Sequence, residues 1–106
     1  MSQPEKTTEV SSGDITIFAA LSDVTRVNLV RRICQTKSVS IAELTKGSGI
    51  TRQAVTKHLR VLEKAGLIQA QTYGREKHWT QIPDGLNPAT MSLAALTREW
   101  DAALEA

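Results

Sequence analysis

The strongest constraint on the fold is a pair of amphipathic segments joined by a tight turn, between Ser40 and Gly66. Ser40 and Glu43 form an S-x-x-E capping box, which predicts a short helix running to about Lys46. Gly47-Ser48-Gly49 then breaks the chain, and a second helical pattern follows at once. This order of short helix, glycine-containing turn and longer helix is typical of a helix-turn-helix arrangement.

The second helix is predicted over residues 51–65, TRQAVTKHLRVLEKA. Val55, Leu59 and Leu62 recur at i, i+4 and i+7, so they form one apolar stripe that packs inward. Thr51 stands where an N-cap is needed, and Gly66 follows as a C-terminal stop. The helix therefore has a defined beginning, a defined end and one inner face.

The outer face of this helix combines base-edge hydrogen bonders with cations and a hydroxyl that suit phosphate oxygens. Its members, none of them acidic, are Arg52, Gln53, Thr56, Lys57, Arg60 and Lys64. We interpret this set as a nucleic-acid surface, with the helix free to enter a major groove. The alternative is an ordinary solvated helix whose cations only keep it soluble.

The distribution of charge favours the nucleic-acid interpretation. Residues 26–78 hold eleven cations and three acids, a net charge of +8, whereas residues 1–25 and 79–106 each carry −3. A basic middle between acidic ends is expected when one surface meets nucleic acid and the rest faces elsewhere, for instance a second subunit.

A β-hairpin is predicted after Gly66. Residues 67–72 and 77–82 are short extended runs, and Gly74 can supply a positive φ at the tip between them. Arg75 and Lys77 lie at or beside that tip, where they can reach phosphates next to the groove. Solubility alone would also explain two cations on a hairpin tip.

Three further helices complete the predicted fold, over residues 14–21, 23–35 and 87–104. Ser22 is the predicted cap of the second of these, and Asn87, followed by Pro88, the predicted cap of the last. The last helix carries an apolar seam, typical of paired helices, with nothing after it in the sequence to cover it. We expect the first helix and a symmetry mate to cover it, through Ile17, Phe18, Leu93, Leu96, Trp100 and Ala103.

Length and composition limit the remaining possibilities. The chain has 106 residues, which predicts one domain at residues 14–106 behind a flexible polar tail at residues 1–13. Neither a long apolar run nor a signal peptide is evident, so a cytoplasmic protein without a membrane partner is expected. No catalytic constellation or phosphate-binding glycine loop can be assembled, so an enzyme is not expected.

The segments ALSDVTRVNLV (20–30), TRQAVTKHLRVLEKAGLI (51–68) and YGREKHW (73–79) resemble the ArsR family of small winged-helix repressors. The resemblance covers the chain from about Ile15 to its end. It implies a mainly α fold of five helices with a small β-hairpin wing. It also implies a homodimer through the first and last helices, and repression through double-stranded DNA.

By position, the resemblance assigns DNA contacts to the outer face of the recognition helix and to the wing. These residues are Thr51, Arg52, Gln53, Thr56, Lys57, Arg60, Arg75 and Lys77. The chain departs from the metal-sensing members, because Ser40 and Ala42 stand where those members carry a cysteine pair and no histidine follows His78. No metal and no cofactor are therefore expected, and the effector cannot be inferred.

Cys34 is the only cysteine of the chain, which rules out an intrachain disulfide. It shares a predicted inner stripe with Val27, Val30 and Ile33, so a buried core thiol is favoured over a redox sensor. A rival to the DNA-binding function is a protein-interaction module that binds an acidic partner. Gln53 and Thr56 count against this rival, because charge complementarity alone does not need them.

Overall fold

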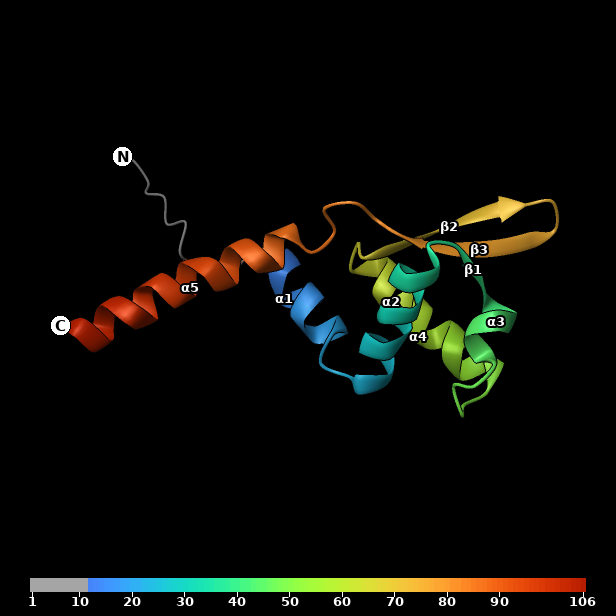
Figure 1. Ribbon diagram of the computed structural model, residues 1–106, viewed down its shortest axis with the longest axis horizontal. Coiled ribbons are helices and arrows are strands. Elements are labelled where there is room, and N and C mark those ends of the chain that lie inside the picture. The colour runs from blue at the N-terminus through green and yellow to red at the C-terminus, as the bar shows by residue number, and fades with distance from the viewer. Residues whose placement is uncertain (1–11) are drawn as a thin grey trace.

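The computed structural model describes residues 12–106, and most of the predicted tail at 1–13 lies outside the described residues. In chain order the elements are α1 (Ser12–Ala20), α2 (Val24–Thr36), β1 (Val39–Ser40), α3 (Ile41–Thr45), α4 (Arg52–Lys64), β2 (Ile68–Tyr73), β3 (Glu76–Gln81) and α5 (Asn87–Glu105). Figure 1 shows a head made of α2, α3, α4 and the sheet, with α1 lying between this head and the start of a long protruding α5. The predicted helices and the predicted hairpin are confirmed.

The core of the head lies where α2, α3 and α4 meet the sheet. Val55, Leu59 and Leu62 of α4 are completely buried, as their spacing predicts. Ile33 of α2 and Leu44 of α3 are completely buried against the same core. Each side chain of this kind stabilises the fold by about 1.5–3 kcal/mol when removed from water. The burial fixes which side of α4 remains outside.

The sheet has three antiparallel strands in the order β1-β3-β2. The hairpin of β2 and β3 turns at Gly74, whose φ of +63° is a conformation that glycine adopts without a steric cost. The short strand β1 was not predicted; its Val39 pairs with Trp79 of β3. It ties the start of α3 to the hairpin, so the wing is anchored to the helix-turn-helix unit.

The helix caps agree with the sequence at α3 and α4 but not at α2. Ser40 and Glu43 form both bonds of the capping box. At α2 the cap is Asp23, whose carboxylate accepts the Arg26 backbone N–H at 3.1 Å. The predicted cap Ser22 instead donates its hydroxyl to Ala19 O of α1 at 2.7 Å. Ser22 therefore stabilises the end of α1 rather than the start of α2.

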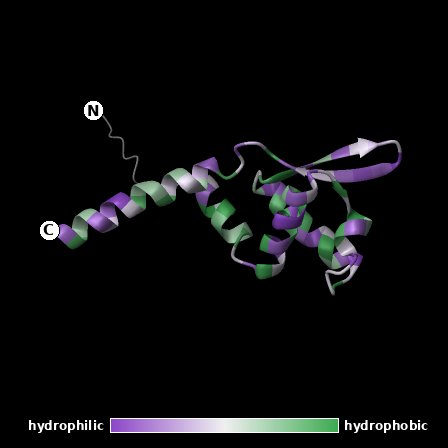
Figure 2. Cartoon of the chain, in the orientation of Figure 1, coloured by the Kyte–Doolittle hydropathy of each residue, from purple (hydrophilic) through white to green (hydrophobic). Residues whose placement is uncertain are grey.

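Helix α5 protrudes from the head and meets the rest of the chain mainly through α1. The Ser92 hydroxyl of α5 bonds the Asp14 carboxylate of α1, and Ala89 and Ala95 are buried nearby. Asn87, the predicted cap, is the first residue of the helix and makes no capping bond. Apolar residues continue along α5 beyond the part that α1 covers (Figure 2). Among the helices of residues 12–106, none is both long and apolar enough to cross a membrane.

Candidate nucleic-acid interface

The outer face of α4 is open to solvent, because the buried stripe turns the other way. The N-terminus of the helix is fixed by Thr51, whose hydroxyl accepts the Ala54 backbone N–H at 3.1 Å. The Thr56 hydroxyl donates to Arg52 O at 2.9 Å, and the residue itself is half-buried. Among the predicted DNA contacts of α4, all except Thr56 are exposed: Thr51, Arg52, Gln53, Lys57 and Arg60.

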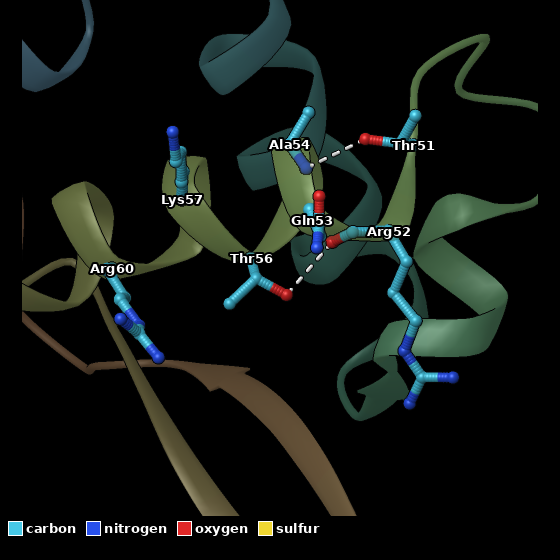
Figure 3. Close-up of a pocket in the computed structure, with 7 residues that line it drawn as sticks. All are labelled: Thr51, Arg52, Gln53, Ala54, Thr56, Lys57 and Arg60. Carbon is cyan, nitrogen blue, oxygen red and sulfur yellow. Dashed lines mark hydrogen bonds between the residues drawn. The ribbon is translucent and has the colours of Figure 1, made fainter.

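These residues surround one open hollow of about 730 Å³ that runs along α4 from Thr51 to Arg60. Figure 3 shows Arg52 and Arg60 pointing to one side of the helix, whereas Lys57 points to the other. Within the described part of the chain, neither arginine side chain nor Lys57 takes part in an ion pair. Their charges are therefore free for an external anion, and no acid lies between Thr51 and Arg60.

The wing brings further cations to the edge of this surface. A smaller hollow of about 220 Å³ lies between the wing, the start of α3 and the start of α4. Arg52, Arg75 and Lys77 all line it, so side chains far apart in the sequence meet there. The Lys77 ammonium also lies 5.4 Å from the centre of the buried Trp79 ring, a cation–π contact that orients it. The two predicted groups thus meet at Arg52, which lines both hollows, and Glu76 is the one acid among the lining residues.

Arginine side chains inside the head position the helices. Arg32 of α2 donates from Nη1 to Leu44 O and from Nη2 to Glu43 O, both at 2.7 Å. These bonds satisfy carbonyls at the end of α3, where no further turn of helix follows to donate N–H groups to them. Sequence reasoning assigned no such role to Arg32. The sequence around Arg32 holds no local signal for it, because the accepting carbonyls belong to α3.

Two carboxylates in the head are held in their charged form by caps. The Arg26 backbone N–H lowers the pKa of Asp23 below its ordinary value of 3.8. The Ser40 backbone N–H and hydroxyl lower the pKa of Glu43 below 4.5 in the same way. Both carboxylates are solvated, so these bonds anchor the ends of α2 and α3 rather than create reactive groups.

Cys34 is exposed, which corrects the prediction of a buried core thiol. The stripe of α2 that is buried runs through Leu29 and Ile33, with Val30 half-buried. Cys34 therefore falls just outside it, at a small hollow of about 140 Å³ that Val30 and Gln81 also line. The exposure alone does not make the thiol reactive.

The two histidines lie apart and each has a neighbour of its own. His58 of α4 faces Arg26, and His78 of β3 contacts Glu76, with 2.9 Å between Nε2 and Oε1. The side chains of residues 12–106 contain no group of three His, Cys, Asp or Glu residues arranged to hold a metal ion.

The predicted dimer residues divide into exposed and covered ones. On α5, Leu93 and Leu96 are about half exposed, at 52% and 51%, and Trp100 is 66% exposed. Ala103 is exposed too, and Phe18 of α1 is half-buried. Ile17, in contrast, is only 4% exposed because its own chain covers it, so it has little surface to offer a partner.

Comparisons with known proteins agree with this architecture. Residues 21–69 match a family model described as a helix-turn-helix domain. The chain is 38% identical over 65 residues to the uncharacterized HTH-type transcriptional regulator YuzN of Bacillus subtilis (strain 168), a match that covers 56% of this chain and 71% of that protein. It is 32% identical over 70 residues to the arsenical resistance operon repressor of the same organism, covering 66% of this chain and 67% of the repressor.

A solved structure extends the likeness to the whole fold. The ArsR-like transcriptional regulator from Rhodococcus sp. RHA1 superposes with a TM-score of 0.78 and 31% identity, covering 89% of this chain and 88% of that one. This coverage extends well beyond residues 21–69, which the family model matches. With its acid-free outer helix face and its basic wing, this chain belongs to the ArsR family of winged helix-turn-helix, DNA-binding transcriptional regulators.

Proposed function

We propose that this chain is a repressor that binds an inverted-repeat operator as a homodimer. The observation that carries the proposal is the basic surface formed by α4 and the wing, whose cations form no ion pair among residues 12–106 although Glu76 lines the smaller hollow. Because α4 is buried on one side only, it can lie in a major groove without rearrangement of the core. The name of the relative described as an operon repressor supports repression rather than activation.

The side chains of this surface divide into one that suits base edges and several that suit phosphates. Gln53 is exposed in the first turn of α4, so its amide can make paired hydrogen bonds to the edge of an adenine. Arg60 lines the larger hollow, and Arg75 and Lys77 line the smaller one. Their cationic side chains suit phosphate oxygens. Specificity would then come from the start of the helix, and most of the affinity from its flanks and the wing.

The homodimer is supported by the exposed apolar stripe of α5. Leu93, Leu96 and Trp100 repeat at spacings of three and four, the pattern of a helix that pairs with another. Most of this stripe lies beyond the residues that α1 covers, so a second copy is its natural cover. A two-fold dimer would present two copies of α4 to successive major grooves, about 34 Å apart.

Selection of duplexes from a random DNA pool tests the proposal. We expect the recovered sequences to contain two inverted half-sites whose centres lie about one helical turn apart. The variant Gln53→Ala should recover looser half-sites, while Arg98→Ala, on α5 and far from α4, should recover the same sites as the wild type. Recovery of a single half-site would refute the dimeric operator, and failure to enrich any duplex would favour the acidic-protein rival.

A further inference from the structure

The guanidinium of Arg26, a residue of α2, forms hydrogen bonds with both α1 and α4, so it connects three helices. Its Nε donates to Ala20 O at 2.7 Å and its Nη2 to Ala19 O at 3.2 Å, both at the end of α1. Its Nη1 donates to Nδ1 of His58, on α4, at 3.3 Å. The side chain is only 17% exposed, so these bonds form largely out of water. One residue of α2 thus holds both α1 and α4.

The contact with His58 requires that Nδ1 of the imidazole be unprotonated, because the guanidinium can only donate. The nearest acid is Asp23, whose Oδ2 lies 4.0 Å from Arg26 Nη1. The Asp23 carboxylate offsets the charge of the guanidinium. The orientation of the guanidinium is set by the α1 carbonyls and the His58 imidazole. Hydrogen bonds from a charged donor are roughly twice as strong as neutral ones.

The elements joined by Arg26 have different tasks in the proposed dimer. Helix α4 carries the DNA-facing side chains, whereas α1 packs on α5 through the bond between Asp14 and Ser92 and through buried apolar groups. A change in the angle between α1 and α4 would move the two copies of α4 relative to the two-fold axis. The distance between them therefore depends on what holds α1 to α4.

We infer that Arg26 is a positioning residue that sets the operator spacing, by fixing the recognition helix α4 through His58 to α1, the helix that packs on the dimer-forming α5. This inference rests on the proposed dimer and names the residue that determines its spacing. Neither Arg26 nor His58 lines the basic hollow, so the inferred role needs no contact between them and DNA.

Two versions of the selected operator test the inference, one with the selected spacing and one with a base pair inserted at its centre. The measured quantity is the ratio of the two binding affinities. The wild type should strongly prefer the selected spacing. Arg26→Met removes all three bonds and should reduce this preference by roughly tenfold, the effect expected from the one bond that reaches α4. Arg26→Lys, which keeps a donor for the α1 carbonyls, should restore part of it.

A second pair of variants separates positioning from loss of folding. His58→Leu removes the acceptor while it leaves the bonds from Arg26 to α1, so the spacing preference should fall. His58→Gln retains an acceptor oxygen and should keep a preference close to the wild type. In all four variants the dependence of affinity on salt should match the wild type, because no phosphate contact is removed.

The outcomes distinguish the inference from the proposed function. Should the wild type be monomeric or indifferent to the inserted base pair, the proposed dimer fails. Should the wild type prefer the selected spacing while folded Arg26→Met and His58→Leu keep that preference unchanged, the positioning role is overturned. Equal behaviour of His58→Leu and His58→Gln would overturn it as well.

Discussion

Replacement of Trp100 by glutamate tests the part of the proposal on which DNA recognition depends most, the pairing of two chains through α5. Trp100 is 66% exposed in the single chain. A tryptophan buries roughly 150–250 Å² when fully covered, so covering this exposed part contributes about 2.5–4 kcal/mol at roughly 25 cal/mol per Å². A two-fold dimer contains the contact twice.

The expected loss is therefore about 5 kcal/mol at the lower limit, and the new carboxylates would lie in an apolar seam. Because every 1.4 kcal/mol changes an equilibrium constant by about tenfold, the dimer of Trp100→Glu should dissociate at concentrations roughly several thousand times higher than the wild type. Sedimentation velocity over a range of protein concentrations measures this constant directly. Circular dichroism checks that the head of the variant remains folded.

The matched control is Met91→Glu. Met91 is also apolar and 71% exposed on α5, but it lies on the other side of the helix from Leu93 and Trp100. This variant should remain dimeric. The reasoning is refuted if Trp100→Glu sediments as a dimer over the same range as the wild type, or if both variants dissociate equally.

Three further predictions concern the DNA-facing surface and its supports. Gln53→Ala should lower the discrimination between the preferred and a mismatched base pair by roughly 1–3 kcal/mol, measured by competition with mutated operators. Arg60→Gln should reduce the slope of log affinity against log salt by about 1.8, for one phosphate contact in each subunit, whereas the slope for Arg98→Gln should equal that of the wild type. The lowered pKa values of Asp23 and Glu43 give stability that is present above their ordinary values of 3.8 and 4.5 and is lost as the pH falls through the lowered ones, so thermal unfolding should occur at lower temperature near pH 3 than near pH 6. A double variant with Asn and Gln at these two positions should show a smaller difference between the two pH values.

The elements predicted well are those whose signals are local. Helix α4 has its cap Thr51, its apolar period and its terminating Gly66 within one short stretch, and all three features occur in the structure. The wing was predictable for the same reason, because Gly74 marks the tip between two short extended runs. The exposure of the basic side chains then follows from the burial of the opposite stripe.

The features that were missed depend on partners far away in the sequence. Strand β1 exists because Val39 pairs with Trp79. A strand of two residues is too short to show a periodic pattern in the sequence. Cys34 follows the buried Ile33, but which neighbour of a buried residue is covered depends on the packing of other elements. The bond from Arg26 to His58 likewise requires the angle between α2 and α4, which no local pattern contains.

The protruding end of α5 affects how the amount of dimer depends on the number of chains that the cell makes. From Leu96 to the end of the chain every side chain is exposed, so a single copy offers this segment no support. A helical segment of fewer than about 12–15 residues is marginal in water without such support. In the proposed dimer, the ordering of this segment and the association of two chains are then one event. At low expression the number of dimers would rise with roughly the square of the number of chains. Repression would therefore increase steeply once the number of chains passes a threshold.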